Sequence, residues 1–173
     1  EGGGGADTSR SSNAPPAHLR FGLGVDIAAV SGPGLVGLGL GLQARGGVQL
    51  SPWFAVYYQP PAVGALAVRE ASTAGAIGAV FNSVNFELDL PVFQIGVGPS
   101  RDILWFADCA IGSLACGTAA GSYFGADVRA AVMLGPHGPG SHAGFAIEAN
   151  LHPTFIENSV LTTVTLGVAG EIY

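Results

Sequence analysis

Residues 19–30 read LRFGLGVDIAAV, and the alternation in this stretch decides the fold. Successive side chains of a β-strand point to opposite faces, so one face of this strand is apolar. The other face carries glycines together with the charged Arg20 and Asp26, and residues 36–45 repeat the pattern up to Arg45. A soluble barrel packs bulky apolar groups inside and turns polar groups to water. Here the small and charged residues suit a narrow interior, so the pattern predicts a β-barrel whose apolar face lies outside.

The composition agrees with a barrel that exposes apolar side chains. Only 10% of the 173 residues are charged, the mean hydropathy is +0.46 and the net charge is −6. This acidic balance argues against a nucleic-acid partner. No stretch reaches 18 apolar residues free of charge, since Asp108 interrupts the most apolar one at 103–121. High hydropathy without a long apolar run is typical of a transmembrane β-barrel.

The chain start and the cysteines suggest processing and an oxidising compartment. Residues 1–17 are rich in Gly, Ser and Pro, so we expect a flexible leader before a barrel at 18–173. No signal peptide precedes Glu1, and we expect it to have been removed. Cys109 and Cys116 fit one disulfide, with a reduced, buried pair as the alternative. On one helix they would be about 10 Å apart, so a disulfide would require a loop.

Eight strand segments follow the leader. If both termini lie on one side of a membrane, the two longest connections, 60–78 and 99–121, both fall on the opposite side, while the turns beside the termini are mostly short. This asymmetry is known from transmembrane barrels. The expected strands cover residues 18–30, 35–45, 47–59, 79–90, 92–98, 122–134, 143–153 and 160–172.

Aromatic residues cluster near the expected strand ends. Aromatic rings prefer the headgroup level of a bilayer, so two belts are expected at the two interfaces. The first predicted belt consists of Phe21, Trp53, Phe54, Phe93 and Phe145, and the second of Tyr58, Phe81 and Phe124.

Over residues 18–173 the chain resembles the small eight-stranded outer-membrane β-barrels of the OmpA and OmpX type. The resemblance rests on strand number, alternation, loop asymmetry and the terminal Tyr173. It implies an all-β, antiparallel up-and-down barrel in the bacterial outer membrane. Such barrels end in an aromatic residue that the assembly machinery reads. Here Tyr173 falls on the face of Thr165 and Glu171, so either a bulge resets the register or the assembly signal is weak.

The charged residues of the inner face are expected to pair, because isolated charges in a narrow interior are costly. The predicted pairs are Arg20 with Glu171, Arg45 with Asp89, and Arg129 with Glu148. Glycines on the same face could leave water-filled room. The predicted lumen network consists of Arg20, Asp26, Arg45, Glu87, Asp89, Asp127, Arg129, Glu148, His152 and Glu171.

The leading functional hypothesis is a structural, anchoring or surface-interaction role with a largely plugged lumen. A narrow small-solute pore is the second hypothesis. The third is a lipid-modifying enzyme that uses His152 with Ser159 or Ser122, although no triad spacing supports catalysis. The fourth is a soluble β-barrel that assembles through its apolar face.

No enzyme activity and no cofactor are expected. A metal site is not expected either, because the candidate ligands His137 and His142 only flank a turn rich in Gly and Pro. The expected partner is the lipid bilayer. A protein partner would bind connections 60–78 and 99–121, since loops on a rigid scaffold carry recognition. The sequence leaves the oligomeric state open.

Overall fold

The computed structural model describes residues 17–69, 73–110, 116–134 and 143–172, and almost all of them lie in β-strands. The proposed leader, 1–17, lies outside this part of the chain except for Ala17. None of the described residues forms a helix long and apolar enough to cross a bilayer. The strands are β1 (His18–Gly32), β2 (Leu35–Ser51), β3 (Phe54–Gln59), β4 (Ala62–Arg69), β5 (Thr73–Asp89), β6 (Phe93–Ala110), β7 (Cys116–Leu134), β8 (Ala143–Ile156) and β9 (Ser159–Ile172).

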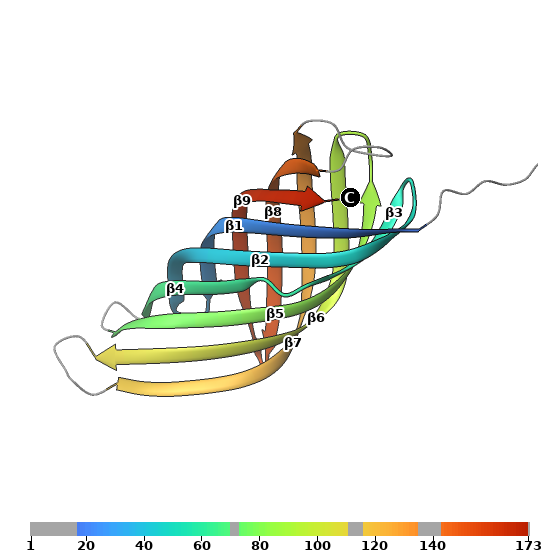
Figure 1. The fold of residues 1–173 in the computed structure, drawn as a ribbon. Helices are drawn as coiled ribbons and strands as arrows, with labels where there is room; N and C mark the ends of the chain where they lie inside the picture. Colours follow the sequence, from blue (N-terminus) through green and yellow to red (C-terminus); the bar gives the residue numbers. More distant parts are fainter. Residues whose placement is uncertain (1–16, 70–72, 111–115, 135–142, 173) are drawn as a thin grey trace, which may run out of the picture.

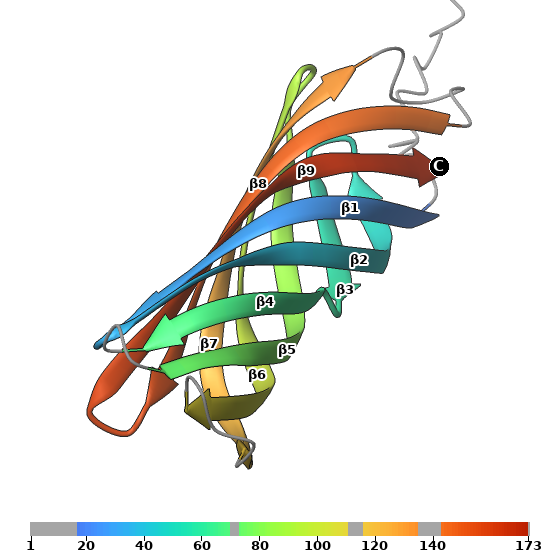
Figure 2. The same ribbon diagram turned by 90° about the vertical axis from the view of Figure 1, so that its left-hand side faces the viewer.

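The strands close into an antiparallel ring with eight positions. β3 and β4 share one position, because both pair with β2 on one side and with β5 on the other. β9 pairs with β1, and β1 pairs with β2, so no edge is left open. Figures 1 and 2 show the strands steeply tilted around the ring, with the start of β1 beside the end of β9. The predicted up-and-down barrel is confirmed.

One row of paired residues shows how far the strands are staggered and which side chains face outward. Followed once around the ring, the row starts at Leu19 and returns to β1 at Ala29, ten residues further along. Such a stagger tilts the strands and closes eight of them around a space that side chains can fill. Every member of the row is apolar. The row runs through Leu19, Val48, Val56, Phe86, Val97, Val128, Leu151, Val164 and Ala29.

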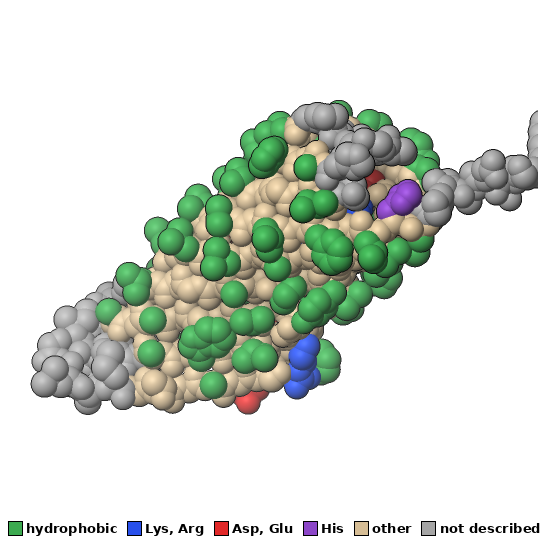
Figure 3. Space-filling view, viewed as in Figure 1, with side chains coloured by type: hydrophobic (Ala, Val, Ile, Leu, Met, Phe, Trp, Pro, Cys, Tyr) green, Lys and Arg blue, Asp and Glu red, His purple; other side chains and the backbone are tan. Residues whose placement is uncertain are grey.

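Exposure alternates along the strands in the inverted sense. Leu38 and Leu66 on the outside are 74% and 78% exposed, whereas Glu87 on the inside is 1% exposed. Figure 3 shows hydrophobic side chains over the visible face and very few charged ones. Apolar exposure on this scale is unfavourable in water and suits hydrocarbon.

Two connections predicted as long loops are wrong. Most of 60–78 belongs to β4 and β5, and most of 99–121 belongs to β6 and β7. Over 62–67, 74–80 and 103–106 both faces are apolar: Ala65 and Leu104 are buried inside, while Leu66 and Trp105 are exposed outside. An alternation of polarity therefore does not exist there to be detected. The loop asymmetry used as support is lost with this correction.

The expected strands 35–45 and 47–59 imply a turn at Gly46, and this prediction is also wrong. β2 continues through this glycine, and the chain reverses at Pro52 and Trp53. Gly47 lies opposite Tyr57, and a Cβ at Gly47 would come within 2.3 Å of the Val56 carbonyl oxygen. Gly47 thus permits the close approach of β2 and β3, and this pair of glycines lies within a strand and not in a turn.

Consecutive prolines interrupt the wall between β3 and β4. Pro60 and Pro61 have no backbone N–H to donate, so the pairing with β2 stops at Gly46 and resumes at Leu42. On the outer wall beside this interruption lies a groove of about 550 Å³. It is lined by Leu23, Gly24, Val25, Leu42, Gln43, Ala44, Pro60, Ala62 and Val168.

Candidate functional site: the barrel lumen

The first layer of the lumen lies near the chain ends and is built around Arg20. β1 directs this guanidinium inward, where one Nη donates to Asp89 at 2.5 Å and the other to Glu171 at 2.6 Å. Arg20 also donates to Gln49, whose amide in turn donates to Asp89. The pair between Arg20 and Glu171 forms where β9 closes against β1, as strand order requires.

Arg45 occupies the next layer, and its predicted pairing with Asp89 is wrong. Its Nη2 donates to Glu87 at 2.8 Å, and its Nε lies 3.2 Å from Glu171. Asp89 is taken by Arg20, which reaches it across the lumen. The height of a residue along the barrel could not decide between Asp89 and Glu87 as the partner of Arg45, because long side chains from different strands meet near the barrel axis. The guanidinium of Arg45 also stacks over Tyr57, 3.7 Å from the ring centroid.

Arg129 joins the network from β7. It donates through Nε to Glu148 at 3.0 Å, and through Nη1 to Glu87 at 2.8 Å and to Gln94 at 3.0 Å. Its Nη2 lies 3.6 Å from Glu171. The structure therefore brings Arg129 and Glu148 together.

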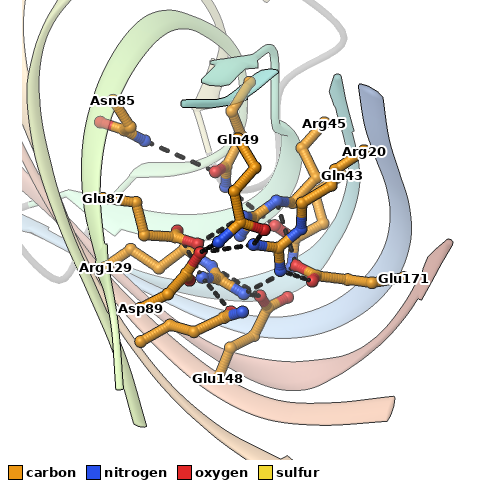
Figure 4. Close-up of polar contacts among 12 residues, drawn as sticks. Arg20, Gln43, Arg45, Gln49, Asn85, Glu87, Asp89, Arg129, Glu148 and Glu171 are labelled. Atoms are coloured by element: carbon orange, nitrogen blue, oxygen red, sulfur yellow. Dashed lines mark hydrogen bonds and ion pairs between the residues drawn. The ribbon is translucent and has the colours of Figure 1, made fainter. Parts of the chain in front are cut away.

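The three arginines and four carboxylates form one connected, buried cluster (Figure 4), here called the charged network. Its members come from six of the eight ring positions, so it ties opposite walls together. Buried charges are tolerated when each has opposite charges and hydrogen bonds around it. The charged network consists of Arg20, Arg45, Glu87, Asp89, Arg129, Glu148 and Glu171.

The inward glycines do not leave the empty room that the sequence suggested. A Cβ on Gly22 would lie 2.8 Å from the side chain of Arg45, and one on Gly24 would lie 2.9 Å from Gln43. At Gly167 a Cβ would come within 2.0 Å of the Asp26 carboxylate. Neighbouring polar side chains thus occupy the space that these glycines provide. Asp26 is held there by Gln43, which donates to it at 3.2 Å.

A second cluster of polar side chains surrounds His152, farther from the terminal end of the lumen than the charged network. Its Nε2 lies 3.0 Å from Asp102 and its Nδ1 lies 3.2 Å from Asp127. An imidazole between two carboxylates donates to both when both nitrogens carry protons. The ring stacks on Phe81, with centroids 4.0 Å apart. We call His152, Asp102, Asp127, Ser100 and Thr154 the histidine cluster.

The serine beside His152 is neither of those expected. Ser100 Oγ lies 3.1 Å from its Nε2, whereas Ser122 accepts a bond from Arg101 on the outer wall and Ser159 donates to the carbonyl of Ile156. Sequence reasoning missed Ser100 and Asp102, because both lie in the segment predicted as a loop. A strand assignment for 99–110 would have placed both residues on the inner face.

Beyond the histidine cluster, the described residues that are buried in the lumen form an apolar cluster. The buried residues there come from β1, β4, β5, β6 and β9, so the apolar cluster spans the end of the barrel away from the termini. Phe81 belongs to it and is 1% exposed, so its predicted place in an aromatic belt is wrong. The apolar cluster consists of Ala28, Val30, Val63, Ala65, Ala67, Ile77, Ala79, Phe81, Leu104 and Leu161.

The other predicted belt residues do lie on the outer surface. Exposed aromatic rings surround the end that holds the termini: Phe21, Trp53, Phe54, Phe93 and Phe145. Phe124 is 70% exposed toward the other end, and Tyr58 is exposed on β3. Their assignment to two membrane interfaces stays a prediction.

The two cysteines lie on strands and not in a loop. Cys109 of β6 and Cys116 of β7 are direct partners in the antiparallel register. Their side chains lie outside the described part, so the disulfide stays a prediction.

A closed eight-stranded ring with an apolar outside and a charged inside defines the class of small outer-membrane β-barrels. Neither a protein-family model nor a curated protein matches the sequence. Among solved structures, Neisserial surface protein A (NspA) is similar with a TM-score of 0.62 at 9% identity, over 91% of this chain and 99% of that one.

Two further solved structures have the same fold. Ail, the attachment invasion locus protein of Yersinia pestis, in complex with the heparin analogue sucrose octasulfate, gives a TM-score of 0.60 at 11% identity, with 89% of this chain and 97% of that one covered. The outer membrane protein OprG from Pseudomonas aeruginosa gives 0.54 at 10% identity, with 89% and 96% covered. The likeness at this level of identity is one of fold.

Proposed function

We propose that this chain is an outer-membrane barrel with a closed lumen that serves as a structural or surface-presenting element and does not transport solutes. The observation that carries the proposal is the stacking of three side-chain groups along one lumen. The charged network, the histidine cluster and the apolar cluster follow one another from the terminal end outward. Water and ions would have to break buried ion pairs and then cross an apolar layer.

The end away from the termini is the proposed contact surface for a partner. β5, β6 and β7 are 17, 18 and 19 residues long, and they project there as a continuous sheet (Figure 1). Most of the two connections first proposed for recognition belongs to β4, β5, β6 and β7, so a partner would meet the surfaces of strands. Strand surfaces that are already ordered lose little conformational freedom on binding.

Among the described residues one arrangement resembles a catalytic triad, and it does not support catalysis. Ser100, His152 and Asp127 are within hydrogen-bond distance in that order, but all three are buried in the lumen. Asp102 also faces Nε2, the nitrogen that a general base would use to accept the serine proton. An Nε2 that donates to Asp102 has no lone pair for that step. We therefore propose a structural role for the histidine cluster.

Conductance across a planar lipid bilayer tests the closed lumen. Purified barrel inserted at 1 M KCl is expected to leave the membrane at its baseline current. Insertion is checked on the same sample by protease protection in vesicles. Reproducible step increases in current from inserted protein would contradict the proposal and support the small-solute pore.

A further inference from the structure

The outer wall carries one charged side chain that the lumen does not explain. Among the strand residues whose side chains the structure describes, Arg101 is the single charged group that faces outward. It lies on β6, between Asn82 of β5 and Phe124 of β7 in the register. A lone cation on the lipid side needs a reason, because its cost is large at the bilayer midplane and small only near an interface.

The position of Arg101 along β6 places it near the far interface of the apolar band. Phe93 marks the terminal end of the strand, and Arg101 follows it by eight residues. At about 3.3 Å per residue and a tilt of about 40°, this separation is roughly 20 Å along the membrane normal. The apolar band of an outer-membrane barrel is about 25 Å tall. Phe124 and Phe155 follow Arg101 on the next two strands, and their exposed rings lie beside it on the outer wall.

The guanidinium is held in a fixed orientation. Its Nε donates to Ser122 Oγ at 2.7 Å, and its plane lies over Phe124, 4.7 Å from the ring centroid. Its backbone carbonyl accepts a bond from Asn82, which in turn accepts one from the Tyr58 hydroxyl. Within the described residues Arg101 has no carboxylate partner, and its two terminal nitrogens have no acceptor.

We propose that Arg101 binds the phosphate of an anionic lipid headgroup in the leaflet at the end away from the termini. The terminal nitrogens of an arginine match two phosphate oxygens, and Ser122 and Phe124 set their direction in advance. From this depth the long side chain of an arginine can extend to the level of the lipid phosphates. The proposal rests on the membrane-spanning barrel proposed above.

Selective labelling makes the site observable, because the chain has only six arginines. Protein labelled with 15N-arginine is folded in maltoside micelles, which contain no phosphate, and short-chain phosphatidylglycerol is titrated in. We expect a saturable shift of the Arg101 Nε–H signal, assigned by its loss in Arg101→Gln. Signals of the buried Arg20, Arg45 and Arg129 should stay in place.

Two parallel titrations identify what is bound. Diacylglycerol with the same chains lacks the phosphate, and inorganic phosphate lacks the lipid; neither is expected to move the Arg101 signal. Arg101→Lys keeps the charge but loses the two-pronged geometry, so its lipid affinity, measured by native mass spectrometry, should fall several-fold. In the same assay Arg101→Gln should lose the preference for phosphatidylglycerol over diacylglycerol.

Three results would overturn the proposal. An unmoved Arg101 signal would exclude the site, an equal shift with diacylglycerol would reduce it to apolar contact, and an equal shift with inorganic phosphate would make it a free-anion site. Failure of the barrel itself is recognised separately, because the three buried arginine signals would then collapse into the unfolded region.

Discussion

Arg129 is the residue on which most of the charged network depends. It contacts Glu87, Glu148 and Glu171 as well as Gln94, and it is completely buried. Removing one member of a buried ion cluster leaves its partners charged and unpaired, which costs far more than losing an exposed ion pair.

Arg129→Leu is therefore expected to lower the free energy of unfolding by about 3–5 kcal/mol. Urea unfolding in lipid vesicles, followed by tryptophan fluorescence, measures this change. The double variant Arg129→Leu/Glu148→Leu is the matched control and should recover part of the loss, because one orphaned carboxylate is removed. A single variant as stable as the parent would show that the charged network does not hold the barrel together.

Strand elements were predictable where the two faces of the wall differ in polarity. β1, β8 and β9 alternate clearly because their inner faces carry charged, amide or hydroxyl groups such as Asp26, Glu148 and Thr165. The far halves of β4, β5, β6 and β7 line the apolar cluster, so their two faces look alike in sequence. The predicted site shares this limit: the charged network lies on clear strands, whereas Ser100 and Asp102 of the histidine cluster do not.

The sequence predicted which residues belong to the charged network better than it predicted which of them form ion pairs with each other. Arg20 and Glu171 meet because adjacent strands bring them together, as do Arg129 and Glu148. The partner of Arg45 depends on contacts across the lumen, which the order of strands does not specify. The prediction of water-filled room beside the inward glycines was wrong for a related reason. The space beside a glycine on one strand is occupied by a side chain of the neighbouring strand.

The pairing of β6 with β7 leads to a prediction about the two cysteines. Residues directly opposite each other in antiparallel strands have Cα atoms about 4.5–5.5 Å apart, within the range for a disulfide. Cys109 and Cys116 are such partners. We expect protein refolded with a glutathione redox pair to resist alkylation in denaturant until it is reduced.

Mass spectrometry before and after reduction measures that state. The matched control Cys109→Ser leaves one thiol and should alkylate once without reduction. Two alkylated thiols in the unreduced parent would favour the alternative of a reduced pair.

The described part of the molecule is inverted relative to a soluble protein: all of its charged strand side chains except Arg101 face the inside of a closed ring, and its exposed outer wall is mostly apolar. The row from Leu19 to Ala29 is apolar at every position, so the outer wall has no polar gap along this row. Closure by β9 and β1 removes sheet edges, which is a requirement for strands in hydrocarbon. A soluble barrel that assembles through its apolar face would have to cover this entire wall with other chains.

The most direct test of this account is the electrophoretic mobility of the protein folded into lipid vesicles, compared in SDS with and without boiling. A closed, membrane-embedded barrel resists SDS, so the unheated sample should migrate faster than the boiled one and should sediment with the vesicles. Equal mobility of the two samples, from protein that stays soluble without detergent or lipid, would contradict the account.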